Sequence, residues 1–405
     1  MRADFLRGVR FTDLTWAGAG PFGTKVFSDF GAEILKVESM ARPDAVRVTN
    51  PFKDGVAGIN RSGYFASRNT GKKSVAINMK LPEGRDLVLR LIEASDVVSN
   101  NFGPGAIERL GLGYDVLKQR KPDIIFLSMP MYGDDGPYSR FLGVGKTISA
   151  VTGLMRSTAY GEGDAVGPGT HYPDHAANPY HAAFAVLAAL RYRRKTGLGM
   201  KIELAQIEST SNFVGAGLVE ATITGKEPPQ NGNRSRGDAP HGIFLCQEED
   251  TWCAIAVGSN AEWLALAAQI DRHDLGARPD LGHSVGRLRN VALLERAVSQ
   301  WTATLPAEEV AQRLRTAGVP AAIVASSRYL IEQDKQLAQR GFFQILDHPE
   351  MGPSLFTSPP YRVDGERVEL VRQPLFGEHT HEVMSKVLGL SDEQIRGLAE
   401  RKVLA

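Results

Sequence analysis

The sequence has few cysteines, no excess of one charge and no long apolar run, and each absence excludes a class of protein. Cys246 and Cys253 are the only cysteines in 405 residues, too few for a disulfide framework or a cysteine cage around a metal ion. The formal net charge of +1 lacks the basic excess of nucleic-acid-binding proteins. No apolar run is long enough to span a bilayer, and residues 1–10 lack the apolar core of a signal peptide. We therefore expect a cytoplasmic protein that binds neither nucleic acid nor membrane.

The length of the chain and a shift in composition predict two domains. A chain of 405 residues is too long for one ordinary hydrophobic core. Residues 224–238 are rich in Gly, Pro, Asn and Arg, which is typical of a linker. The first domain is therefore expected over residues 1–223, and a smaller α+β domain after the linker.

Strand-like and helix-like runs alternate in the first half. Helices are expected at Phe22–Phe30 and Glu83–Ala94, and a longer helix begins at Pro179, with Asn178 as its cap and Gly197 after its end. The expected strands are Val9–Leu14, Ala32–Glu38, Ser74–Asn78, Asp96–Ser99 and Asp123–Ser128. This alternation predicts an α/β fold with a mostly parallel sheet that is covered on both faces.

A glycine-rich turn after the first strand leaves two interpretations open. Residues 18–23 fit the pattern G-x-G-x-x-G, and Glu38 lies twenty residues after Gly18, where a ribose-binding acid belongs in a dinucleotide fold. A nicotinamide-dependent dehydrogenase is therefore one hypothesis. Pro21 weakens it, because proline removes a backbone N–H where a pyrophosphate would need one. The alternative is a tight turn whose glycines permit close packing.

Read at full length, the same segments resemble a known family. DLTWAGAGPFGTKVFSDFGAEILKVE, RNTGKKSVAINMKLPEGRDL, NNFGPGAIERLGLGYDVL and AALRYRRKTGLGMKIELAQIES are similar to segments of class III CoA-transferases. This CaiB/BaiF-like family includes formyl-CoA transferase and carnitine CoA-transferase. AGVPAAIVASSRYL and GEHTHEV extend the resemblance over almost the whole chain.

The resemblance implies a specific architecture. The large domain would be Rossmann-like, residues 239–335 would form the smaller α/β domain, and residues 336–405 would return to the large domain. Two subunits would interlock as a homodimer, or this chain would pair with a homologous second subunit.

The resemblance also implies a site and a reaction. Its nucleophile corresponds to Asp174, in the segment His171-Tyr172-Pro173-Asp174-His175. Coenzyme A, a substrate rather than a permanently bound cofactor, would contact Ala19, Lys72, Asn101, Phe102 and Arg109. The cations of Lys72 and Arg109 suit its phosphate groups. CoA would pass from an acyl-CoA donor to a carboxylic acid through an aspartyl anhydride and an aspartyl-CoA thioester on Asp174.

The sequence departs from the formyl-CoA transferase pattern at three places. Gly18 stands where those enzymes have glutamine, residues 143–146 lack a tyrosine, and residues 236–242 lack a glycine run. These differences indicate substrates other than formate or oxalate.

Three further alternatives bear on the site. An α-methylacyl-CoA racemase would carry a GHD-like motif, whereas residues 143–145 read Gly-Val-Gly. A non-catalytic CoA-binding subunit of a heteromeric transferase would not need Asp174. His171 and His175 have the i,i+4 spacing of metal ligands, but Pro173 between them argues against a helix there, so we expect no metal site.

Overall fold

The computed structural model describes residues 4–161, 164 and 166–405, and it divides into two compact units. Unit 1 contains the residues up to 155, residues 167–226 and residues 336–405. Unit 2 contains residues 156–166 and 227–335. The short segment 156–166 therefore belongs with the second unit, although no shift in composition sets it apart.

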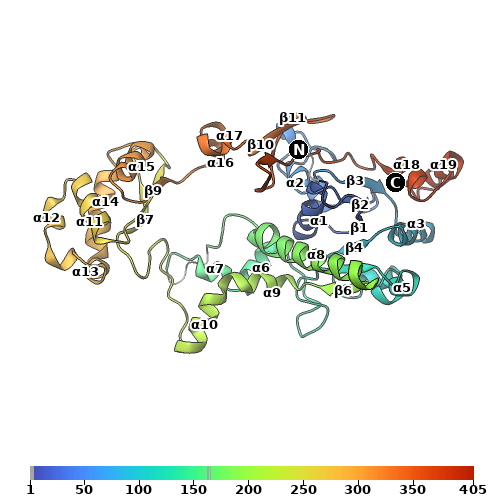
Figure 1. The fold of residues 1–405 in the computed structure, drawn as a ribbon, viewed down its shortest axis with the longest axis horizontal. Helices are drawn as coiled ribbons and strands as arrows, with labels where there is room; N and C mark the ends of the chain where they lie inside the picture. The colour runs from blue at the N-terminus through green and yellow to red at the C-terminus, as the bar shows by residue number, and fades with distance from the viewer. Residues whose placement is uncertain (1–3, 162–163, 165) are drawn as a thin grey trace. The chain divides into compact units, whose positions relative to one another are not determined.

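A six-stranded parallel sheet forms the centre of unit 1 (Figure 1). The spatial order is β3-β2-β1-β4-β5-β6. The strands are β1 (Arg10–Asp13), β2 (Glu33–Glu38), β3 (Lys73–Ala76), β4 (Val97–Asn100), β5 (Ile125–Ser128) and β6 (Met200–Glu203). The predicted α/β class and parallel sheet are confirmed.

Helices cover both faces of this sheet, and neighbouring strand residues bury on opposite faces. Ile34 packs in the core beneath α1 (Ala19–Asp29) and α8 (Asn178–Thr196), and the next residue, Leu35, packs in the core of the opposite face. That second face is covered by α3 (Pro82–Glu93), α5 (Tyr114–Arg120), α18 (Thr380–Lys386) and α19 (Asp392–Glu400). Because both faces are buried, neighbouring residues such as Ile34 and Leu35 are both apolar.

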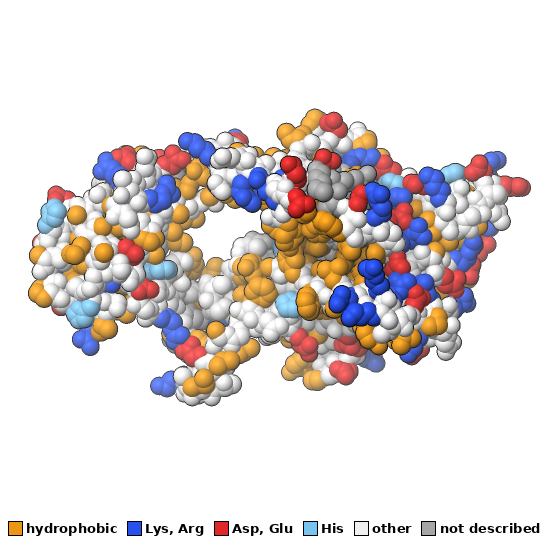
Figure 2. Space-filling model, in the orientation of Figure 1, with side chains coloured by type: hydrophobic (Ala, Val, Ile, Leu, Met, Phe, Trp, Pro, Cys, Tyr) orange, Lys and Arg blue, Asp and Glu red, His pale blue; other side chains and the backbone are white. Residues whose placement is uncertain are grey.

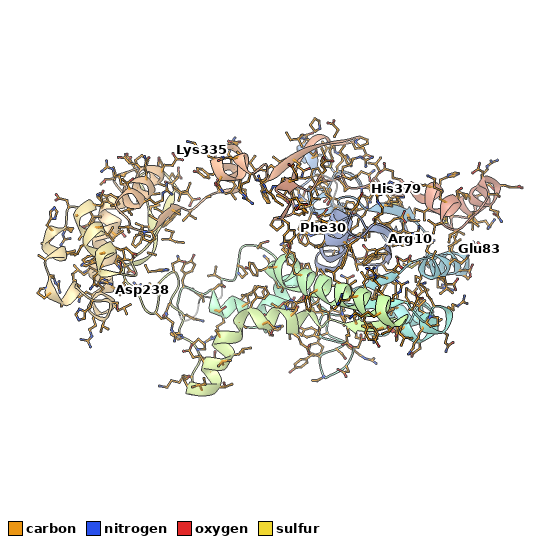
Figure 3. The ribbon with its side chains drawn as sticks, in the orientation of Figure 1. Arg10, Phe30, Glu83, Asp238, Lys335 and His379 are labelled. Carbon is orange, nitrogen blue, oxygen red and sulfur yellow. The ribbon has the colours of Figure 1, made fainter. Side chains whose placement is uncertain are left out.

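The end of the chain packs on the sheet of unit 1. The backbone N–H of His379 donates to the carbonyl oxygen of Ser74 in β3 over 3.0 Å. Arg401, after α19, pairs with Glu83 of α3 over 3.2 Å; His379 and Glu83 are labelled in Figure 3. These contacts join α18 and α19 to the core face near β3.

The long helix α8 continues from a π-helical turn, η3 (Pro173–Ala177). Because η3 runs directly into α8, the helix has no free end at Asn178, and the predicted cap is wrong. The side chain of Asn178 instead donates to Oε1 of Gln206 and accepts from the hydroxyl of Ser209. Gly197 ends α8 with a φ of 75°, as expected.

The remaining elements of unit 1 connect and extend this layer structure. They are α2 (Gly63–Ala66), α4 (Ala106–Arg109), α6 (Gly145–Val151), α9 (Gln206–Ser211), α10 (Gly215–Thr224), and the strand pairs β10 (Phe343–His348) with β11 (Gly352–Thr357) and β12 (Arg362–Val363) with β13 (Glu366–Arg367). The helices α7 (Leu154–Ser157) and α17 (Lys335–Gln339) cross the boundaries between the units.

Unit 2 has its own antiparallel sheet and its own core. The sheet has the order β7 (His241–Leu245), β8 (Trp252–Ala256), β9 (Ala321–Ile323). The helices of this unit are α11 (Asn260–Gln269), α12 (His273–Gly276), α13 (Ser284–Arg289), α14 (Val291–Thr302), α15 (Ala307–Thr316) and α16 (Ser327–Glu332). Both cysteines are buried in this core, as free thiols. In the described part of the chain, every helix is too short or too polar to cross a membrane.

Candidate active site

The loop that follows β1 is held in place by the polar side chains of Asn101 and Asp44. Asn101 accepts a hydrogen bond from the backbone N–H of Trp16 over 2.9 Å and donates to its carbonyl oxygen over 2.8 Å. Asp44 accepts from the N–H of Ala17, a residue with a φ of 62° that L-amino acids rarely adopt. A backbone fixed in this way at the carboxyl end of a parallel strand is typical of a functional loop.

A cleft of about 300 Å³ opens beside this loop, at the carboxyl edge of the sheet. Its walls come from the segments that follow β1, β2, β3 and β4. The lining residues are Trp16, Val37, Glu38, Ser39, Ala41, Arg42, Ile77, Asn78, Met79, Lys80, Phe102, Ala106, Arg109 and Leu110. Crevices at this edge are where open α/β sheets bind ligands.

Three cations surround the cleft, and two of them were missed from the sequence. Arg42, Lys80 and Arg109 are all exposed, and the guanidinium of Arg42 lies 4.7 Å from the ring centre of Trp16. Arg42 follows β2 and Lys80 follows β3, so their places after strands were the signal that could have revealed them. Three exposed cations around a mainly apolar lining suit an anionic ligand that also has a flat ring.

Lys72, which we expected at the phosphates of CoA, is not among the residues that line this cleft. The residue is 2% exposed, and its ammonium donates to Asp13 Oδ2 over 3.2 Å, to Pro21 O over 2.8 Å and to Thr24 Oγ1 over 2.7 Å. Burial raises the pKa of Asp13, but Lys72, Lys36 and two threonine hydroxyls outweigh it and hold that pKa below its usual value. Lys72 therefore joins β3 to β1 and α1 from inside the core.

The other residues expected at the CoA site lie at different distances from the cleft. Phe102 and Arg109 line it, and the ring of Phe102 meets Trp16 edge-on at 6.2 Å. Asn101 does not line the cleft, but its side chain fixes the backbone of Trp16, which does. Ala19 is the buried first residue of α1 and lies outside the lining.

Asp174 lies in η3, where its carboxyl group fits between two glycines from separate segments. The residue is 9% exposed. A Cβ added to Gly18 would lie 2.7 Å from Cγ of Asp174, and one added to Gly145 would lie 2.8 Å from its Oδ2. Both distances are too short for real atoms, so the absence of side chains at these two positions makes the space for Asp174. Gly18 is two residues from Trp16, so the loop after β1 connects the cleft with this carboxyl group.

The charges around Asp174 are only partly balanced. Burial raises the pKa of Asp174, and electrostatic interactions with His171 and Arg68 oppose that rise. Within the described residues, no cation lies within salt-bridge distance of its carboxylate, and no hydrogen bond to that carboxylate is present. Burial, together with Arg68 and His171, lowers the pKa of the neighbouring His175 to about 4, so its ring is neutral at pH 7.

The features that suggested a dinucleotide site serve other contacts. The carboxylate of Glu38 is held by Arg47 over 2.6 and 2.7 Å and accepts from the hydroxyl of Ser74 over 2.7 Å. It is therefore occupied where the dehydrogenase hypothesis needs it to bind a ribose. The described residues also contain no cluster of three or more side chains suited to a metal ion.

The parallel sheet, the cleft and the buried carboxylate define an α/β protein with a candidate active site, and comparison with known proteins identifies its family. The profile of CoA-transferase family III matches residues 6–380, so the chain belongs to this family of CoA-transferases.

Individual proteins are similar to this chain over nearly its whole length. The chain is 29% identical to the formyl-CoA:oxalate CoA-transferase of Streptomyces coelicolor, with 100% of both chains covered. It is 31% identical to the succinyl-CoA–L-malate CoA-transferase beta subunit of Chloroflexus aurantiacus, with 98% of each covered. The crystal structure of a CaiB/BaiF family protein from Brucella suis superposes with a TM-score of 0.86 at 25% identity, over 95% of this chain and 100% of that one.

Proposed function

We propose that the protein moves CoA from an acyl-CoA donor to a carboxylic acid and that Asp174 carries the covalent intermediates. Asp174 would attack the donor thioester, which forms an acyl-aspartyl anhydride and releases CoA thiolate. The thiolate then attacks the aspartyl carbonyl, which forms the aspartyl-CoA thioester and frees the donor acid. The acceptor acid reverses both steps, so no proton needs to be transferred.

The single observation that carries this proposal is the environment of Asp174. A buried carboxylate with no salt bridge and no hydrogen bond among the described residues has no structural partner, unlike Asp13 and Glu38 nearby. Its raised pKa reflects that lack of stabilisation, and a poorly stabilised carboxylate is a better nucleophile. The loop from Trp16 to Gly18 connects it with a cleft of the right charge for the phosphates of CoA.

The first turn of α1 supplies candidate donors for the oxyanions of this reaction. No side chain caps α1, and the N–H groups of Ala19 and Gly20 have no partner among the described residues. Gly18, whose Cα adjoins the carboxyl group of Asp174, is the N-cap of the same helix. Backbone donors fixed beside the reacting carbonyl stabilise developing negative charge without reorganisation.

The assembly we propose is a dimer, formed with a second copy or with a homologous subunit. α8 leaves four large apolar side chains at the surface, namely Tyr180, Phe184, Leu187 and Tyr192, and Phe184 is 77% exposed. Figure 2 shows hydrophobic side chains at the surface in the region where Figure 1 draws α8. An apolar surface of this kind favours a protein partner. The name of the Chloroflexus relative, a beta subunit, supports a heteromer as the second possibility.

Trapping the intermediate tests the proposal. A panel of acyl-CoA donors would be screened against carboxylic acids by mass spectrometry. The best donor would then be incubated with the protein and hydroxylamine. We expect a hydroxamate on the peptide that contains Asp174, and none in Asp174→Ala. Transfer that persists in Asp174→Ala would refute the proposal, and loss of the α-deuterium of a labelled acyl-CoA would point to a racemase instead.

A further inference from the structure

Arg68 is a buried arginine close to Asp174. It lies between α2 and β3 and is 3% exposed. Its guanidinium stacks on the ring of Tyr64 at 3.5 Å, and its Nη1 donates to the carbonyl oxygen of Tyr64 over 3.0 Å and to the hydroxyl of Ser67 over 2.8 Å. The stacking and these two bonds fix the plane of the guanidinium.

The remaining edge of this guanidinium lacks an anionic partner. Its Nε is buried without a hydrogen-bond partner, and its Nη2 contacts Nε2 of the neutral His175. Among the described residues no carboxylate lies within salt-bridge distance of Arg68. The buried guanidinium of Arg47, in contrast, is held by both oxygens of Glu38. Burying a cation without an anion is costly, so a protein that retains one has a use for it.

The free edge of the Arg68 guanidinium lies close to the proposed nucleophile, Asp174. His175 follows Asp174 directly, and the charges of Arg68 and Asp174 influence each other although they are not in contact. The guanidinium therefore lies against the residue next to the nucleophile, and the ring of Phe22 in α1 lies 5.7 Å from that of His175.

We propose that Arg68 binds the carboxylate of the acid that enters and leaves the reaction, and that it does so chiefly when Asp174 is acylated. This inference rests on the function proposed above. In the free protein the negative charge of Asp174 repels an acid and partly balances Arg68. In the aspartyl-CoA thioester Asp174 is neutral, so Arg68 is left as the nearest charge and attracts a carboxylate. A planar guanidinium suits the two oxygens of that group, because its Nε has no partner and its Nη2, which contacts His175, carries a second N–H.

The bond changes of that step balance. A carboxylate oxygen of the acid, oriented by Arg68, attacks the carbonyl carbon of the aspartyl-CoA thioester. A C–O bond forms, the C–S bond breaks and CoA leaves as the thiolate, so one negative charge enters and one leaves. The thiolate then attacks the acid's carbonyl carbon in the anhydride, which gives the new acyl-CoA and restores the Asp174 carboxylate.

Binding of acetate, a carboxylate without other groups, tests the inference without turnover. Asp174→Asn imitates the neutral, acylated state. We expect acetate to stabilise Asp174→Asn against thermal unfolding at concentrations about fivefold lower than for the unchanged protein, with chloride at equal ionic strength as control. The double variant Asp174→Asn, Arg68→Gln should lose this response. Equal stabilisation of the double variant would overturn the inference.

Kinetics separate this role from a structural one. Arg68→Gln should raise the KM for the acid about tenfold or more, because charged hydrogen bonds are lost, while the KM for acyl-CoA changes less than twofold. Arg68→Lys should recover part of the loss, and hydroxamate should still form on Asp174. Arg120→Gln, which removes an exposed guanidinium paired with Glu93, is the matched control and should change neither constant. Equal changes in both constants would contradict the inference. Failure to label Asp174 in the unchanged protein would refute the function instead, and the acetate experiment would still test Arg68.

Discussion

Unit 1 contains two groups of buried charges, and they are organised in opposite ways. At the carboxyl ends of β1 and β2, Asp13 is paired with Lys72 and Glu38 with Arg47. Around η3, Asp174 and Arg68 are also buried but have no ion pair among the described residues. The first group fixes the loop and strands on which the site is built. The second keeps its charges unsatisfied, which is what a nucleophile and a binding group require.

Substitution of Asp174 should give the largest loss of transfer activity. It would show that the buried charges without ion pairs carry the reaction. Asp174→Asn keeps the shape of the side chain but removes the nucleophile, so transfer should fall about a thousandfold or more. Steady-state transfer assays on the best donor and acceptor would measure the loss. CoA binding, measured by calorimetry, should remain within about twofold, which distinguishes lost chemistry from lost structure. Transfer activity within tenfold of that of the unchanged protein would contradict the role of Asp174 as the nucleophile.

Substitution of Lys72 tests whether the paired group is structural. Lys72→Met leaves Asp13 buried beside hydroxyl groups without its cation, and breaking such a pair costs about 3–5 kcal/mol. Urea unfolding followed by circular dichroism would measure it. Whatever protein remains folded should bind CoA normally. A stable variant with weakened CoA affinity would restore the phosphate contact originally expected for Lys72.

The exposed cations at the cleft should show the reverse behaviour. Lys80→Ala and Arg109→Ala should each weaken CoA binding roughly tenfold, more at low salt than at high salt, because exposed charges are screened. Neither change should move the urea midpoint measurably. Lys386→Ala, on an exposed lysine 3.4 Å from Glu382, is the matched control. Unchanged CoA affinity in both cleft variants would contradict our assignment of Lys80 and Arg109 to the phosphates of CoA.

The smallest effect concerns stability and pH. Because the pKa of Asp174 is raised in the folded protein, the folded state holds its proton more tightly than the unfolded state does. The cost of ionising Asp174 is absent below the unfolded pKa and develops as the pH rises through the folded pKa. Asp174→Asn should therefore unfold at a higher temperature than the unchanged protein at pH 7, and the difference should shrink toward pH 4. A variant less stable at pH 7 would contradict this sign.

The sequence was sufficient for five of the six strands of the large sheet, but it missed β6 and did not reveal the direction of individual side chains. The strands could be predicted because apolar runs such as Glu33–Glu38 are buried on both faces. The role of Lys72 could not, because residue type and place in the chain do not reveal that its ammonium points into the core. Asn178 was misjudged for a related reason, since nothing local indicates that a π-helical turn precedes α8. Arg68 drew no attention, because its unpaired edge is a property of the folded surroundings.

The two glycines beside Asp174 have a consequence for directed evolution. Any side chain at position 18 or 145 would occupy the volume of the nucleophile's carboxyl group. A selection for new acid specificity that explores single substitutions should therefore recover none at these positions. Larger residues there become accessible only after a change in η3 has moved Asp174, so the order in which mutations arise decides which specificities can be reached.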